Sequence, residues 1–192
     1  MNTQFSTTGI SDVFDIYSDK GAFNISLESS SSGAKLTHQI RSLYRREDFN
    51  RETRTFKVPQ LEFIEDKISY SLHKTIKGFH GDFKTWKLIQ CLKGSVQLVV
   101  LDNRKESSTY GKLEYFVLND VNGKQVLVPP GVGNAHLCVT TDCIFHYKQT
   151  EYYTSPADQF SINPLSENLD IQWNLPREEP ILSERDKNAP DF

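Results

Sequence analysis

The sequence predicts an all-β fold, either a β-sandwich or a jelly roll. Short segments of strand-like composition follow one another closely from residue 56 to residue 151, and turn residues such as Lys93-Gly94 and Asn122-Gly123 separate them. Twelve phenylalanines and eight tyrosines favour strands and aromatic-lined pockets. Strands do not alternate with helices, and neither a GxGxxG motif nor a phosphate-binding loop motif occurs. The pattern therefore excludes a doubly wound nucleotide-binding fold.

The first third of the chain predicts elements outside this β-rich region. Residues 1–30 indicate a short extended entry, in which residues 22–27 alternate as a strand does. The serine-rich residues 29–33 are typical of a low-complexity loop. Residues 34–54 carry many basic side chains and predict a helix with a basic face. That face would be either a solvated surface or a contact for phosphate or a partner.

The β-rich region and the tail complete the predicted order of elements. Eight strands are expected, at residues 61–71, 75–80, 86–91, 95–102, 113–119, 125–128, 135–140 and 144–151. Asn122-Gly123 is the strongest hairpin signal. The last residues are irregular and charged, but the apolar Leu175, Ile181 and Leu182 predict that they dock on the rest. We expect one domain, with an arm and insertion at about 1–57, a core at about 58–153 and a docked tail at about 154–192.

Composition limits the possible partners. The formal net charge is −3, so no overall basic field attracts nucleic acid. No apolar run approaches the length that spans a membrane, and the start lacks the pattern of a signal peptide. Three cysteines without a CxxC unit leave an odd count, which favours a reducing compartment. We therefore expect a cytoplasmic protein that binds neither nucleic acid nor membrane.

Two neighbouring predicted strands carry polar side chains on faces that are otherwise apolar or small. Regular alternation places His80 on the face of Ile76 and Gly78, and it places Lys87 on the face of Ile89. Burying a histidine and a lysine is costly unless they are paired or lie in a wet cavity. These strands are therefore where we expect the chemistry.

The residue types favour acid–base chemistry over the alternatives. A metal site is disfavoured because the chain has no HxH pair and no zinc-type cysteine spacing. A nucleophile elbow is absent, and Cys91 lies in apolar surroundings where a thiol is inert. His80 could act as a base, Lys87 as a cation for an oxyanion, and Tyr147 as a proton donor. Taken singly, each of these side chains could also be a core residue, so the pattern alone predicts a β-sandwich with a polar cavity.

Five stretches, in this order, carry a resemblance to a known family: KGFH (77–80), KLIQC (87–91), PGVGNAH (130–136), YKQTEYY (147–153) and PILSERD (180–186). They are similar to the RGLH, KLVxC, PxGxxH, YKCTxYY and PILSEKD stretches of the dTDP-4-dehydrorhamnose 3,5-epimerases. The resemblance extends from about residue 63 to the C-terminus, with a weaker echo at residues 19–21. It implies a cupin jelly roll with short peripheral helices, which would act on a nucleotide-linked 4-keto-6-deoxy sugar as a homodimer without metal or cofactor.

The resemblance also implies roles for individual residues. His80 would remove a proton alpha to the C4 ketone, Asp186 would hold its other ring nitrogen, Lys87 would steady the enolate oxygen, and Tyr147 would return a proton on the opposite face. The residues expected to bind substrate are Lys77, His136, Lys20, Lys67, Asp66 and Asn134. Lys77 and Lys20 stand where the family has arginines that usually touch phosphate, so the charge is kept and the bidentate fork is lost.

A narrower likeness leaves the substrate open. Residues 63–67, 78–85, 133–136 and 158–160 are similar to the branch that acts on GDP-linked 4-keto-6-deoxy heptoses in capsule pathways. The nucleotide could be GDP, dTDP or CDP, the sugar a hexose or a heptose, and the inversion at one centre or two. A cupin that binds nucleotide sugars without turnover is a further alternative, although binding alone does not require the acid–base set.

Overall fold

The computed structural model describes residues 4–7, 9–10, 14–17, 24–30, 33–39, 61–175 and 179–192. The chain divides into two compact units, one of Met1–Gln4 with Tyr17–Glu62 and one of Phe5–Ile16 with Phe63–Phe192. The described elements of the first unit are β3 (Asn24–Ser30) and β4 (Gly33–Gln39), which form an antiparallel hairpin. The boundaries expected from sequence for arm, core and tail stay predictions. In the described part of the chain, no helix is long and apolar enough to cross a membrane.

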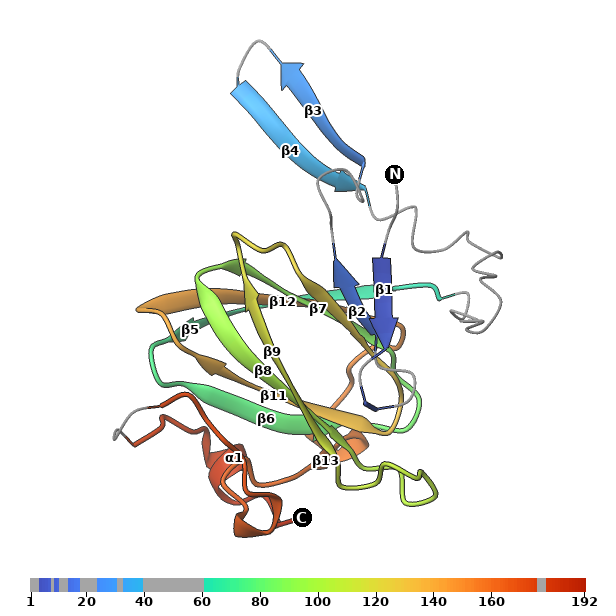
Figure 1. Ribbon diagram of the computed structural model, residues 1–192, viewed down its shortest axis with the longest axis vertical. Coiled ribbons are helices and arrows are strands. Elements are labelled where there is room, and N and C mark those ends of the chain that lie inside the picture. Colours follow the sequence, from blue (N-terminus) through green and yellow to red (C-terminus); the bar gives the residue numbers. More distant parts are fainter. Residues whose placement is uncertain are drawn as a thin grey trace. The chain divides into compact units, whose positions relative to one another are not determined.

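The second unit is built on two antiparallel sheets that face each other (Figure 1). The six-stranded sheet contains, in spatial order, β1 (Gln4–Thr7), β2 (Phe14–Tyr17), β10 (Gln125–Val128), β7 (Lys87–Lys93), β12 (Asp142–Gln149) and β5 (Glu65–Leu72). The five-stranded sheet contains β13 (Phe160–Ser161), β6 (Ile76–Gly81), β11 (Val132–Cys138), β8 (Ser95–Asp102) and β9 (Leu113–Asn119). The described helices are short: η2 (Pro156–Asp158), η3 (Glu167–Leu169) and α1 (Glu184–Lys187). The predicted all-β sandwich with short peripheral helices is confirmed.

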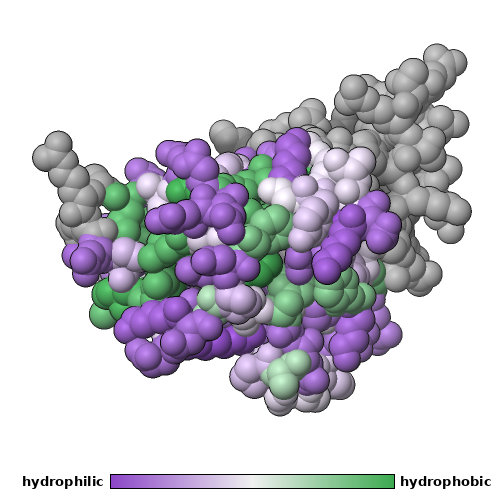
Figure 2. Space-filling view, turned by 90° about the horizontal axis from the view of Figure 1, so that it is seen from below, coloured by the Kyte–Doolittle hydropathy of each residue, from purple (hydrophilic) through white to green (hydrophobic). Residues whose placement is uncertain are grey.

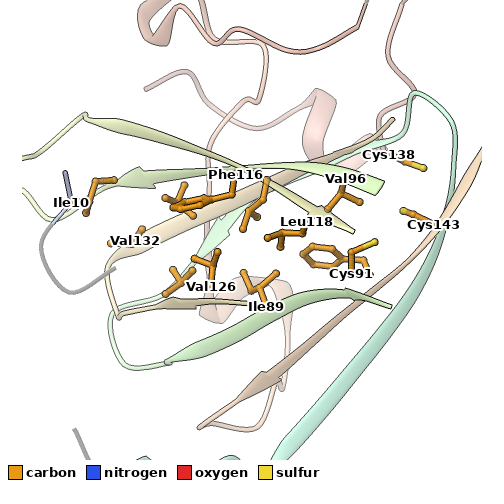
Figure 3. Close-up of a cluster of buried hydrophobic side chains, with 14 residues drawn as sticks. Ile10, Ile89, Cys91, Val96, Phe116, Leu118, Val126, Val132, Cys138 and Cys143 are labelled. Carbon is orange, nitrogen blue, oxygen red and sulfur yellow. The ribbon is translucent and has the colours of Figure 1, made fainter. Parts of the chain in front are cut away.

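The core lies between the two sheets (Figure 3). Ile89 and Val126 enter it from the six-stranded sheet, and Val96 and Leu118 enter it from the five-stranded sheet. This is the packing that period-2 strands produce when each buries one apolar face. One end of the same interior carries polar side chains instead, and those form the site described below.

A second apolar cluster holds the C-terminal segment. Phe79, Val99 and Leu101 of the five-stranded sheet contact residues from the end of the chain, which are Ile162, Leu169, Ile171, Trp173 and Phe192. The segment therefore packs on a sheet face that the core does not use. The face of the molecule in Figure 2 mixes hydrophobic with hydrophilic residues.

The helix predicted for residues 34–54 is wrong at its beginning. Residues 34–39 belong to β4 and pair with β3. Ser29 and Ser30, which were expected in a loop, are the last residues of β3. The physical reason lies in residues 34–37, where the apolar Ala34 and Leu36 alternate with the polar Lys35 and Thr37. This period of two is that of a strand, whereas a helix has a period of 3.6. Residues 40–54 lie outside the described residues.

The hairpin predicted at Asn122-Gly123 is also wrong. β9 pairs with β8, whereas β10 pairs with β7 and β2, so the turn carries the chain from one sheet to the other. Phe116 and Val126 thus reach the core from opposite sheets. The Asn119 side chain accepts hydrogen bonds from the backbone N–H groups of residues 121 and 122, and Gly123 takes a φ of 58°. A glycine turn between apolar strands does not by itself decide whether the strands pair or separate.

Candidate active site

A bulge in β6 brings Lys77 and His80 to the same side of the strand. Along the β6–β11 ladder, Asn134 lies opposite His80 and His136 lies opposite Lys77, so two residues of β6 between these pairs lie opposite one residue of β11. Gly78 lies within the bulge with a φ of 113°, and a Cβ there would be 2.4 Å from the Asn134 carbonyl oxygen. Only glycine fits this conformation and this close approach without a shift.

The bulge corrects the face that we predicted for the histidine. Regular alternation would place His80 with Ile76 and Gly78, but His80 and Lys77 are the β6 residues that line the cavity. The predicted face is wrong because one inserted residue reverses the alternation of every residue after it. The predicted face of the Lys87 strand is confirmed, since Ile89 lies in the core cluster; Phe145 lies in the same cluster and Tyr147 packs against it.

These strands enclose a cavity of about 480 Å³ between β5, β7 and β12 on one side and β6 and β11 on the other, with C-terminal residues at its edge. It is lined by Asp66, Lys67, Ile68, Ser69, Lys77, His80, Lys87, Asn134, His136, Phe145, Tyr147, Gln159, Ser183 and Asp186. Every predicted site residue in the described part of the chain is among them. Lys20 lies outside the described residues.

A histidine–carboxylate pair stands at this cavity. The Nε2 atom of His80 is 2.6 Å from Oδ1 of Asp186, and the Asp186 side chain is 2% exposed. Burial alone would raise the pKa of Asp186, but the hydrogen bond and charge of His80 outweigh it, so the pKa lies below its usual value. An ionised carboxylate can only accept, so Nε2 of His80 carries the hydrogen and Nδ1 is the basic nitrogen.

Lys87 places a buried positive charge beside this pair. Its Nζ donates to Oδ1 of Asn134 at 3.3 Å and to the backbone oxygen of His80 at 3.4 Å. The residue is 4% exposed, and burial lowers its pKa to about 8. Most of the lysine is still protonated at pH 7, so its charge acts on the cavity with little screening from water.

Burial shifts the pKa values of Tyr147 and His136 in opposite directions, and it keeps both side chains uncharged. Burial raises the pKa of Tyr147 to about 12, so its hydroxyl keeps a proton that it can donate. Burial, followed by the charge of Lys77, lowers the pKa of His136 to about 3 and keeps its ring neutral. His136 stacks on Phe145 with ring centroids 3.8 Å apart, and its buried Nε2 has no hydrogen-bond partner among the described residues. An orphaned polar atom in a cavity wall is suited to bind a polar group of a ligand.

Comparison with known proteins identifies the family. The sequence model of the family described as dTDP-4-dehydrorhamnose 3,5-epimerase matches residues 39–192. The chain belongs to this family. It is 33% identical over 134 residues to the dTDP-4-dehydrorhamnose 3,5-epimerase of Salmonella typhimurium. The matched region covers 68% of this chain and 72% of the relative.

Solved structures of relatives have the same fold. The dTDP-4-dehydrorhamnose 3,5-epimerase of Elizabethkingia anophelis is 27% identical with a TM-score of 0.76, and the match covers 99% of this chain and 96% of that one. A 3′-monoepimerase from Streptomyces bikiniensis in complex with dTDP-quinovose is 31% identical with a TM-score of 0.64, over 67% of this chain and 66% of that one. The jelly roll is thus a cupin of the epimerase family, and the chain is an isomerase.

Two further residues of the cavity, Asp66 and Lys67, were predicted to bind substrate, and both contact neighbouring side chains. Asp66 accepts hydrogen bonds from Nε2 of His146 at 2.7 Å and from Nζ of Lys148 at 2.9 Å. The Nζ of Lys67 lies 3.4 Å from the centre of the Tyr153 ring. Among the described residues, no group of three or more histidine, cysteine, aspartate or glutamate side chains is placed to hold a metal ion.

Ser183 and Gln159 line the cavity as well, although neither was predicted as a site residue from the stretches 180–186 and 158–160 that contain them. Ser183 caps α1, because its Oγ accepts from the backbone N–H of Asp186 at 3.1 Å and donates to Oδ2 of Asp186 at 2.8 Å. The signal was present, since a serine three residues before an acidic residue is the pattern of a helix cap. Gln159 follows η2, and its sequence context carries no comparable signal.

Proposed function

We propose that this chain inverts C3, C5 or both in a nucleotide-linked 4-keto-6-deoxy sugar. Nδ1 of His80 takes the proton from the carbon beside the ketone, and the electron pair of that C–H bond moves to the C4 oxygen as an enolate. The Tyr147 hydroxyl then protonates the same carbon from the opposite face, and the ketone re-forms. The observation that carries the proposal is the His80–Asp186 pair in one cavity with Lys87 and Tyr147.

The electrostatics of the cavity support each step. The Asp186 carboxylate stabilises the imidazolium that forms when His80 accepts a proton. Lys87 provides a fixed cation for the developing enolate, and such preorganised charge is a large source of catalysis. Tyr147 remains a phenol over the whole neutral range, because its pKa is raised to about 12. A buried neutral His136 can bind a sugar oxygen without adding charge.

We further propose that the substrate is a GDP-linked heptose and that its product enters a capsule or another surface polysaccharide. The support is the narrower likeness at residues 63–67, 78–85, 133–136 and 158–160, each of which contributes cavity residues. The relative from Streptomyces bikiniensis contains dTDP-quinovose, which supports binding of a nucleotide sugar in this fold. We also propose a cytoplasmic homodimer, as the resemblance implies.

The test is incubation with GDP-, dTDP- and CDP-linked 4-keto-6-deoxy sugars in deuterium oxide. Each proton removed and returned adds one mass unit, so mass spectrometry reports which nucleotide is accepted and how many centres exchange. We expect exchange with at least one of these sugars and the largest rate with GDP. Exchange with none of them would contradict the proposed activity and favour a binding protein, and a faster dTDP sugar would contradict the GDP assignment.

The role of the phenol is tested by Tyr147→Phe, which keeps the ring and its packing. A base alone can only return a proton to the face from which it came, so the variant should still exchange the alpha proton while yielding little inverted product. NMR of the product gives the epimer ratio. An unchanged ratio and rate would show that another group donates the proton.

Inversion at a single centre is the second candidate, because one of the matching structures is a 3′-monoepimerase. The same deuterium experiment separates the two readings. A mass increase of one unit that does not grow with time indicates one centre, and an increase of two units indicates both.

A further inference from the structure

The backbone of His80 is held from the side by the segment that leads into the tail. In the β13–β6 ladder, Ser161 lies directly opposite His80. The neighbouring residues exchange both backbone hydrogen bonds, from Phe79 N–H to the Ile162 oxygen at 3.0 Å and from Ile162 N–H to the Phe79 oxygen at 3.1 Å. The position of β13 therefore sets the position of the histidine.

Arg185 connects this strand to the carboxylate that holds the histidine ring. Its Nε donates to Oγ of Ser161 at 3.0 Å, and its Nη2 donates to Oε1 of Gln159 at 3.3 Å. The residue after Arg185 is Asp186, which binds Nε2 of His80. A closed ring results, which runs from the His80 backbone through Ser161, Arg185 and Asp186 back to the His80 side chain.

We propose that Arg185 is a positioning residue that clamps the His80–Asp186 pair by binding Ser161 and Gln159. The clamp deepens the epimerase function proposed above and rests on it for its effect on turnover. Arg185 need not touch the reacting atoms, since its action passes through Asp186.

The element that carries Asp186 needs such a clamp. α1 is only four residues long, and a single helical turn has little stability of its own. Its other anchors include the Ser183 cap and the backbone pairing of Ile181 with Thr75 on the N-terminal side, and the hydrogen bonds of Asn163 to Pro190 and Asp191 on the C-terminal side. None of these anchors contacts a residue of β13 itself, whereas Arg185 does. Displacing a catalytic group by about 1 Å can lower the rate about 10²-fold, so this restraint matters for the base.

The planar guanidinium suits the task. Two of its N–H groups bind two acceptors on the same short segment, Gln159 and Ser161, which fixes the direction as well as the distance. A lysine would keep the positive charge but could not reproduce both directed contacts. The family stretch similar to residues 180–186 carries a lysine at this position, so the two-contact clamp depends on the arginine of this chain.

The experiment compares Arg185→Lys, Ser161→Ala and the double variant with the parent enzyme. Lys187→Ala is the matched control, because Lys187 is an exposed cation in the same helix and its ion pair in the described part of the chain is with the exposed Glu184, at 2.8 Å. Thermal unfolding of each variant shows that it is folded. The substrate is whichever 4-keto sugar the parent exchanges fastest.

The clamp predicts a specific pattern of rates. Arg185→Lys should lower kcat for deuterium exchange by about 10–100-fold with little change in KM, and Ser161→Ala should lower it by about 5–20-fold, because a base held less firmly reacts more slowly. The double variant should be no slower than Arg185→Lys alone, since both changes break the same contact. Lys187→Ala should match the parent.

A second measurement needs no substrate and so separates this inference from the proposed function. The ring N–H of His80 that is held against Asp186 should give a low-field proton NMR signal in the free parent protein, assigned by its loss in His80→Ala. It should broaden or vanish by solvent exchange in Arg185→Lys and in Ser161→Ala, and persist in Lys187→Ala.

Two results would overturn the clamp. One is an unchanged His80 signal in both variants. The other is a rise in KM without loss of kcat in Arg185→Lys, together with normal kinetics in Ser161→Ala, which would instead make Arg185 a contact for the substrate diphosphate. If the parent exchanges no sugar at all, the NMR result still decides the clamp.

Discussion

Asp102 and Asp186 are both buried carboxylates, with 0% and 1% of the residue exposed, yet their partners differ in kind. Asp102 accepts hydrogen bonds from the backbone N–H, Nε and Nη2 of Arg104, and from the hydroxyls of Ser107 and Thr109. All of these donors lie within seven residues of it in sequence. Asp186 instead binds His80, which lies 106 residues away.

The difference separates a carboxylate that holds a loop from one that serves a reaction. Burial opposes the charge of Asp102, but the hydrogen bonds of Arg104 and Thr109 outweigh it and hold its pKa at about 2. Asp186 also accepts a local hydrogen bond from Ser183, but its distant partner is a histidine whose other nitrogen is basic and whose ring lines the cavity. Burial of a carboxylate therefore does not distinguish the two roles, whereas the identity of its donor does.

The largest effect on turnover is expected for His80→Ala. The described part of the cavity contains no other side chain with a basic nitrogen held by a carboxylate, so deuterium exchange should fall by at least about 10³-fold. Mass spectrometry of the sugar in deuterium oxide measures this. His73→Ala, at an exposed histidine between β5 and β6, is the control and should leave the rate unchanged. Exchange at a near-normal rate in the folded His80 variant would remove the base assignment.

Asp186→Asn should have the next largest effect, a loss of about 10²–10³-fold in kcat. The amide keeps the shape of the side chain, but it cannot stabilise the imidazolium and can offer its NH₂ group to Nε2, which favours the wrong tautomer. Steady-state kinetics with circular dichroism as a folding control measure this. A rate equal to that of the parent would show that Asp186 does no more for the site than Asp102 does.

The sequence predicts the site residues on strands better than it predicts the carboxylate that binds His80. Lys87 and Tyr147 are polar residues in strands whose apolar alternation is visible in the sequence, and His80 stands out by its residue type within such a strand, although the alternation puts it on the wrong face. Asp186 lies in a charged, irregular segment where one acidic residue looks like any other, so only the family resemblance selects it. No periodicity encodes which distant histidine a carboxylate will meet.

The errors in the predicted fold have the same origin. The bulge at Gly78 and the crossing between sheets after Asn119 both depend on which strands become neighbours, and local propensity does not contain that information. The eight core strands were predicted because each is a short run of strand-forming residues between turn residues, a signal that is local in the sequence. Arg185 was overlooked as a site residue because its two acceptors, Ser161 in the two-residue strand β13 and Gln159 just before it, lie in a segment whose structure the pattern does not reveal.

A smaller effect is expected from pH. Burial lowers the pKa of Lys87 to about 8 from 10.5, so the cation is lost as pH rises through 8, and kcat should fall about tenfold by pH 9. Unfolding does not explain this loss. Between pH 8 and 10.5 the unfolded state binds more protons at Lys87 than the folded state, so the contribution of Lys87 to stability rises with pH. Rates and unfolding midpoints measured between pH 7 and 9.5 check both signs, and a flat rate profile would contradict the role of the cation.

The smallest effect on turnover, and the sharpest contrast with Asp186→Asn, is expected for Asp102→Asn. The change places an NH₂ group among donors from Arg104, Ser107 and Thr109 and removes the charge that they surround. We expect a loss of about 2–3 kcal/mol in the free energy of unfolding, the usual scale for buried charged hydrogen bonds. In a chain of this size that loss corresponds to about 5–10 °C in the unfolding midpoint. The kcat per folded molecule should equal that of the parent.

The pH dependence of this loss tests its cause. The folded pKa of Asp102 is about 2 and its unfolded value is 3.8, so its stabilisation is complete above pH 3.8 and is lost as pH falls through about 2. Urea unfolding should therefore show the full difference between parent and Asp102→Asn at pH 6, and a difference that narrows steadily between pH 4 and pH 2. A difference that stays constant with pH would mean that the variant suffers from steric misfit rather than from the lost charge. A fall in kcat at pH 7 would mean that the loop after β8 affects the cavity, and the division between the two carboxylates would no longer hold.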